Sequence, residues 1–322
     1  MATPASPEVE EMARSYMAIR IWSAPAAITL YALSGWLIAH ERTKALLILQ
    51  IWMNGLNIIL DLWFVLGLGW GVEGVAIATL IAEWSGFFLA LYMCRGVFKG
   101  DQWRNWARIF DRAKIKAMAS VNGNIMLRSL LLQIILIGFM FKSASIGDVT
   151  LAANQILIQF LNITAYGLDG FAIAAESLIG VSMGAKSRLN IRRTAIMTSL
   201  WSGVGAVMMA LFFGFFGIWL IKIMATSVEV QDAAALYLPW MVVSPIIGFG
   251  SWVLDGIFIG ATRSRDMRNA MFQSTIVFVF AVLILHPLMG NHGLWLALLI
   301  SYVARTITLM RYYPALETAA DR

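Results

Sequence analysis

The stretch SAPAAITLYALSGWLIAHERTK (residues 23–44) recurs later in the chain as SPIIGFGSWVLDGIFIGATRSR (residues 244–265). The alignment places Gly35 opposite Gly256 and Arg42 opposite Arg263. A second pair, WGVEGVAIATLIAEW (70–84) and MGNHGLWLALLISYV (289–303), keeps nearly the same separation. Because internal repeats are typical of secondary transporters, we expect a duplicated membrane module.

The two copies differ in length. Residues from about Ala113 to Gln231 of the second copy have no counterpart in the first, since the matching positions would precede Met1. We therefore expect the first half to lack its opening three helices.

The composition is typical of an integral membrane protein. Hydrophobic residues make up 60% of the chain and charged residues 13%, against about 25% charged residues in soluble domains. A membrane-spanning helix needs about 20 apolar residues, and alternation with period 2 is absent. The sequence thus predicts an all-α integral membrane protein with about nine transmembrane helices. The expected spans lie near 16–39, 45–68, 74–97, 117–141, 150–182, 196–221, 234–261, 268–288 and 293–311.

Basic residues concentrate in every second loop, which places those loops in the cytoplasm by the positive-inside rule. The C-terminal segment, with Arg305 and Arg311 counted among its basic residues, then also lies inside. The net charge of +6 follows from this asymmetry, so nucleic-acid binding is not indicated. The longest polar connection divides the chain into an incomplete N-lobe (1–98), a basic linker (99–112) and a C-lobe (113–322).

Charged residues within spans are costly and are the first candidates for function. In the first half, Asn54, Asn57 and Asp61 recur on one helix face, and Thr79 lies at mid-span in the following helix. An amide, a carboxylate and a hydroxyl can bind a proton or a small cation such as Na+. The alternative is that these side chains only join helices through hydrogen bonds.

The second half carries Arg128, Asp169, Glu176 and Asp255 within its predicted spans. One cation among three acids can neutralise one of them and leave the others to bind protons or substrate. The alternative is a structural ion-pair network. Arg128 is the one basic residue that this reading assigns to a span.

Motifs for enzymatic chemistry are missing. The sequence contains no H-E-x-x-H, Walker A or G-x-G-x-x-G string, so neither zinc proteolysis nor nucleotide use is indicated. A G-x-S-x-G string at 180–184 lies inside a span, where small residues favour helix packing. We expect a protein that is not an enzyme and that has no cofactor or resident metal.

Several long segments resemble the DinF branch of the multidrug and toxic compound extrusion (MATE) family, from about Arg14 to Arg311. The segments that carry the resemblance are GWLIAHERTKALLILQIWMNGLNIILDLWFVLGL, GVEGVAIATLIAEW, NIMLRSLLLQ, TAYGLDGFA, LDGIFIGATRSRDMRN and GNHGLWLAL. The resemblance implies twelve helices in two six-helix lobes, of which these spans would be the fourth to the twelfth. It also implies a first-lobe cation site made by a carboxylate, an amide four residues earlier and a threonine on the next helix. Asp61, Asn57 and Thr79 stand at those positions.

The function implied by this resemblance is export of drug-like compounds by H+ or Na+ antiport across a bacterial inner membrane. The implied partners are membrane lipids and small apolar or cationic substrates, with the chain acting as a monomer. Two alternatives remain open at this point. One is a flippase for a lipid-linked precursor, which needs several basic residues in its cavity, and the other is a truncated fragment that does not transport.

Overall fold

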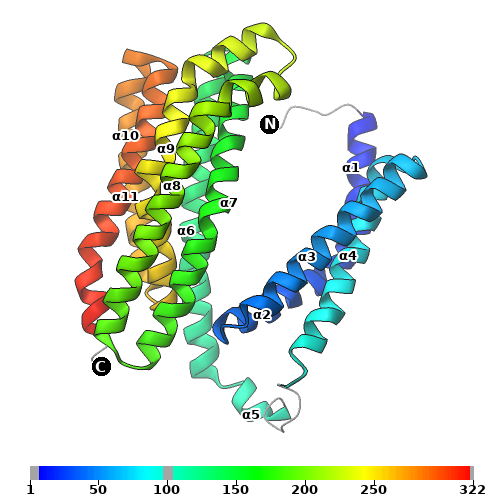
Figure 1. The fold of residues 1–322 in the computed structure, drawn as a ribbon, viewed down its shortest axis with the longest axis vertical. Helices are drawn as coiled ribbons and strands as arrows, with labels where there is room; N and C mark the ends of the chain where they lie inside the picture. The colour runs from blue at the N-terminus through cyan, green and yellow to red at the C-terminus, as the bar shows by residue number, and fades with distance from the viewer. Residues whose placement is uncertain (1–6, 97–103, 320–322) are drawn as a thin grey trace. The chain divides into compact units, whose positions relative to one another are not determined.

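The computed structural model describes residues 7–96 and 104–319, and within these ranges it is helical (Figure 1). Nine of the described helical segments are long and apolar enough to cross a bilayer. The predicted all-helical membrane fold with about nine spans is confirmed. The chain forms two compact units, Met1–Asp111 and Arg112–Arg322, and each is described by itself below.

Unit 1 is organised around one helix, α4, against which the three preceding α-helices pack. Leu37, Leu49, Ala90 and Cys94 form the centre of its small core, with Met53 packed against them. The elements of the unit are α1 (Pro7–Arg20), the 3-10 turn η1 (Ile21–Ser23), α2 (Ala24–Ala39), α3 (Thr43–Asp61), the π-helical segment η2 (Leu62–Gly67), α4 (Gly71–Met93) and the short α5 (Trp106–Ile109). Pro25 lies in the first turn of α2, where its missing N–H leaves no hydrogen bond unmade.

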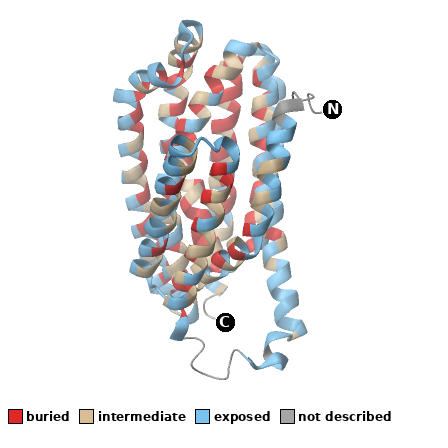
Figure 2. Ribbon diagram, turned by 90° about the vertical axis from the view of Figure 1, so that its right-hand side faces the viewer, coloured by how far each residue is buried: buried red, intermediate tan, exposed pale blue. Residues whose placement is uncertain are grey.

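Unit 2 consists of six long helices: α6 (Arg112–Ala144), α7 (Asp148–Gly184), α8 (Arg188–Met224), α9 (Val228–Gly260), α10 (Ser264–Met289) and α11 (Asn291–Ala319). More than half of the most apolar stretch of α9 and of α11 is buried, whereas the other four helices bury far less of theirs. Figure 2 shows buried residues along the inward sides of the helices and exposed residues along their outward sides. α9 and α11 therefore form the centre of the unit.

The core of unit 2 is held by aromatic contacts between helices. Phe139 on α6 meets Trp295 on α11 edge to face, with ring centroids 5.1 Å apart, and Phe160 on α7 stacks on Phe213 of α8 at 4.9 Å. All four side chains are almost completely buried. Such pairs add to the stability gained from burial of the rings alone.

The repeat seen in the sequence has a counterpart in the backbone. Glu41, between α2 and α3, and Thr262, between α9 and α10, are aligned in the repeat and both have positive φ, at 53° and 56°. In each turn the next residue donates from its backbone N–H to the carbonyl five residues earlier, as Arg42 does to Leu37 at 2.9 Å. This is the Schellman pattern that ends helices. The same turn occurs at Lys186, where the repeat does not predict it.

Two glycines bring α9 into direct backbone contact with α7. A Cβ atom placed on Gly256 would overlap the carbonyl oxygen of Ala172, and one on Gly260 would overlap that of Glu176. The spacing of four residues is the small-xxx-small pattern of closely packed membrane helices. This contact sets the register of α9 against α7, and with it the positions of Asp255 and Glu176 along the two helices.

Candidate functional site

Asp61 is the last residue of α3, and the π-helical segment η2 begins directly after it. The segment is closed by a backbone hydrogen bond from Leu68 N to Trp63 O at 2.9 Å. π-helical turns are rare and occur frequently at functional sites. The carboxylate predicted to couple ions therefore lies where the backbone departs from regular α-helix.

The structure brings together two of the three residues predicted for the first-lobe site. Asn57 donates from Nδ2 to Thr79 Oγ1 at 3.3 Å, and the Thr79 hydroxyl donates to Val75 O at 2.9 Å. The first bond links α3 to α4, and the second, within α4, fixes the orientation of the Thr79 hydroxyl. Asn54, one turn earlier on α3, is exposed.

Asp61 lies one turn beyond Asn57 on the same helix face, and its side chain is half-buried. Its Oδ1 atom is buried without a hydrogen-bond partner among the described residues. An ionised carboxylate in that position is unfavourable in a membrane span, whereas a protonated or cation-bound one is not. The geometry therefore suits a carboxylate that binds and releases a proton or a cation.

In unit 2, the four charged residues predicted from the sequence line one cavity of about 380 Å³. Arg128 comes from α6, Asp169 and Glu176 from α7, and Asp255 from α9. Arg128 Nη2 forms an ion pair with Asp255 Oδ2. Leu132, Ile173, Trp252 and Ile259 supply apolar walls.

Arg305 is the functional candidate that the sequence analysis misplaced. It was counted among the basic residues that orient the C-terminal segment, but it lies inside α11, lines the cavity and is 2% exposed. Its guanidinium forms a second ion pair with Asp255 Oδ2. An arginine within a long apolar helix, several turns before that helix ends, was the available signal.

Unit 1 has a further ion pair within its spans. Arg20 binds Glu83 through two hydrogen bonds of 3.0 Å each, and Arg20 also donates to Ser23 Oγ at 2.8 Å. Glu83 lines a hollow of about 230 Å³ together with Tyr31 and Gln50. The assignment of Arg128 as the one basic residue in a span was therefore wrong, because Arg20 and Arg305 also lie within spans.

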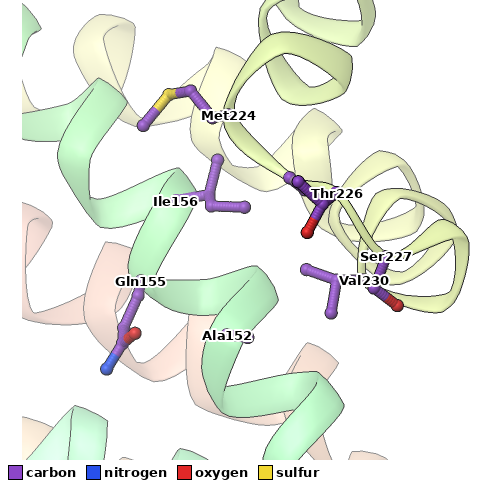
Figure 3. Close-up of a pocket in the computed structure, with 8 residues that line it drawn as sticks. Ala152, Gln155, Ile156, Met224, Thr226, Ser227 and Val230 are labelled. Carbon is purple, nitrogen blue, oxygen red and sulfur yellow. The ribbon is translucent and has the colours of Figure 1, made fainter.

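A second hollow of unit 2 lies between α7 and the connection from α8 to α9 (Figure 3). Its volume is about 390 Å³, and none of its lining residues is charged. Gln155 and Ile156 line it from α7, and Met224, Thr226 and Val230 line it from the connection and its flanking helices (Figure 3). No residue singled out by the sequence analysis lines this hollow, so we do not assign it to the candidate site.

The all-helical membrane fold of this chain resembles that of solved MATE transporters. A mutant form of the MATE transporter VcmN of Vibrio cholerae superposes with a TM-score of 0.88 at 21% identity, covering 98% of this chain and 72% of that one. A transporter of the MOP superfamily from Pyrococcus furiosus gives a TM-score of 0.89 at 17% identity, covering 100% of this chain and 73% of that one. These similarities establish the fold.

Residues 125–286 match the MatE family model, and the chain belongs to this family. DNA damage-inducible protein F of Escherichia coli is 36% identical over 310 residues, which cover 94% of this chain and 66% of the relative. Protein DETOXIFICATION 43 of Arabidopsis thaliana is 24% identical, over 92% of this chain and 55% of the relative. The chain thus spans less than two thirds of the length of these curated relatives. Family membership identifies it as a multi-pass membrane protein of a transporter family, not an enzyme.

Proposed function

We propose that the chain acts as a secondary active efflux transporter that exports drug-like compounds in exchange for inward-moving H+ or Na+. The observation that carries the proposal is the half-buried Asp61, whose buried Oδ1 has no hydrogen-bond partner among the described residues. Asp61 lies one turn beyond Asn57 on α3, and Asn57 donates to Thr79 on α4. The relatives and fold neighbours, one of them a MATE transporter by name, support the same reading.

In this proposal Asp61 is the coupling carboxylate, and Asn57 and Thr79 hold the cation or the water that delivers the proton. When Asp61 is neutral, it needs neither water nor a counter-charge, so burial of its side chain becomes favourable. When it is ionised, a hydrated conformation is favoured. Cation binding thereby shifts the population between two packings of unit 1, in the manner that couples any ligand to a conformational change.

We place the protein in the inner membrane of a bacterium, with the C-terminal segment in the cytoplasm. The alternation of basic and uncharged loops supports this orientation. The proposed partners are membrane lipids and small apolar or cationic compounds, with the chain acting as a monomer.

A lipid-linked precursor flippase is less well supported than drug efflux. Arg305 adds a second arginine to the cavity of unit 2, but it and Arg128 both bind Asp255. With three carboxylates against two guanidinium groups, the cavity carries surplus negative charge. A pyrophosphate group requires the opposite balance.

The test is efflux of a fluorescent organic cation, ethidium, from proteoliposomes under a proton or sodium gradient applied separately. We expect gradient-driven efflux from the unsubstituted chain and none from Asp61→Asn. The matched control is Asp232→Asn, which neutralises an exposed carboxylate near the start of α9 and should leave efflux intact. Equal coupled efflux in Asp61→Asn and Asp232→Asn would refute the assignment of Asp61.

A further inference from the structure

The cavity of unit 2 contains five charged side chains that are not electrically balanced. Arg128 and Arg305 carry two positive charges, and Asp169, Glu176 and Asp255 carry three negative charges when ionised. A low-dielectric cavity penalises each unmatched charge. One of the three carboxylates is therefore left without a cation.

Asp255 is not the unmatched group. Both guanidinium groups converge on its Oδ2 atom, and two opposite charges at contact distance hold a carboxylate in its ionised form. The Asp255 side chain is 8% exposed, and its Oδ1 atom has no hydrogen-bond partner among the described residues. The carboxylate that pairs with both arginines therefore still has one oxygen, Oδ1, without a hydrogen-bond donor among the described residues.

Asp169 and Glu176 differ in their exposure. Asp169 is exposed, so water can solvate its charge, and a solvated carboxylate does not need a cation nearby. Glu176 is half-buried on α7. The charged groups that face it are Arg128 from α6, Asp169 from α7 itself, Asp255 from α9 and Arg305 from α11, while α8 contributes no described charged residue to the cavity lining.

The missing positive charge at Glu176 is better supplied by a proton than by a metal ion. A hard metal cation takes six or more oxygen ligands, and the described residues contain no group of three or more acidic, histidine or cysteine side chains suited to a metal. Asp169 and Glu176 are separated by two turns, about 10 Å along the helix axis, so they cannot chelate one ion together. A proton requires only one carboxylate oxygen.

We propose that Glu176 is a proton-exchange residue of unit 2, a second coupling carboxylate in addition to Asp61. The Glu176 carboxylate accepts a proton from hydronium in the cavity, an O–H bond forms, and water is released. Protonation brings the cavity to electrical neutrality, and deprotonation to water restores its surplus negative charge. The proposal rests on the proposed cation-coupled transport, but proton binding at Glu176 is measurable without transport.

The experiment is infrared difference spectroscopy of the 322-residue chain in lipid vesicles between acidic and alkaline pH, which reports the carbonyl band of protonated carboxyl groups. We expect one such band to disappear in Glu176→Gln. It should persist in Asp169→Asn, the matched control on the same helix, and in Asp61→Asn, which removes only the contribution of unit 1. A band at full intensity in Glu176→Gln, or its loss in Asp169→Asn, would overturn the proposal.

Two further readings keep the test decisive. If Glu176→Gln fails to retain helical circular dichroism, Glu176→Asp is used, and its band must appear at a displaced frequency; an unchanged frequency assigns the band to another group and refutes the proposal. Unimpaired ethidium efflux in Asp61→Asn together with a band that depends on Glu176 would reject the coupling role of Asp61 while supporting proton exchange at Glu176. The failure of one assignment is therefore distinguishable from the failure of the other.

Discussion

Replacing Asp255 with asparagine should strongly destabilise unit 2. The substitution keeps the shape of the side chain and removes the one carboxylate on which Arg128 and Arg305 converge. Two guanidinium groups then face each other in an apolar environment, one of them on a residue that is only 2% exposed. Removing one partner from a buried ion pair costs about 3 to 5 kcal/mol.

That cost corresponds to a fall in the apparent melting temperature of about 6 to 20 °C for a unit of this size. The assay is thermal unfolding of the purified chain in detergent, followed by circular dichroism. Glu229→Gln, an exposed acid in the first turn of α9, is the control and should change stability by no more than about 0.5 kcal/mol.

The double variant Asp255→Asn with Arg305→Met should recover most of the loss, because an apolar side chain of similar size replaces an unpaired buried charge. Unlike Asp255→Asn, Glu176→Gln should be neutral or stabilising, since it removes a charge that has no partner. A cost below about 1 kcal/mol for Asp255→Asn, or no recovery in the double variant, would show that the two arginines do not depend on Asp255.

Three further predictions concern packing and burial. Gly260→Ala should destabilise unit 2 by about 1 to 3 kcal/mol in the same melting assay, because its Cβ would overlap the Glu176 carbonyl, whereas Gly170→Ala, which meets open space, should be neutral or slightly stabilising. Asn154→Ala should cost about 2 kcal/mol or more, because Asn154 is fully buried and its amide bonds Ser143, Asn291 and Trp295; an unchanged melting temperature would contradict this. Burial raises the pKa of the Cys94 thiol above its ordinary value of 9.0, so maleimide labelling at neutral pH should be slower than for a free thiol and should accelerate in Leu37→Ala, which opens the core around it. Because folding favours the protonated thiol, its contribution to the stability of unit 1 should decline as pH rises above about 9.

The helical membrane fold was predictable because apolar length alone specifies it. Stretches of about 20 apolar residues leave few choices other than spanning helices. The repeat aligns Glu41 with Thr262, and the structure shows that both residues have positive φ. Several predicted spans were shorter than the helices observed. α7 and α8, for example, each continue for 37 residues, because their polar ends remain helical after the apolar stretch has ended.

The candidate site was only partly predictable. Asp61, Asn57 and Thr79 were recognisable from their positions, and the structure joins Asn57 to Thr79. Arg305 was missed although it lies inside the expected span 293–311. Its pairing with Asp255 could not be predicted, because it depends on how α9 and α11 pack. The π-helical segment after Asp61 was also not predictable, because a π-turn differs from an α-turn only in its backbone hydrogen bonds and not in its amino-acid composition.

The backbone contact of Gly256 and Gly260 with α7 has a mechanical consequence. Where the backbones of α7 and α9 touch without side chains between them, no rotamer change can absorb a displacement. We therefore expect these two helices to move together. The rest of the lining of the unit 2 cavity comes from α6 and α11, which carry Arg128 and Arg305, so we expect any change in the width of the cavity to come from these two helices. The two helices expected to move carry the positive charges of the cavity. A change in its width would therefore alter the distances from the two arginines to the carboxylates on α7 and α9.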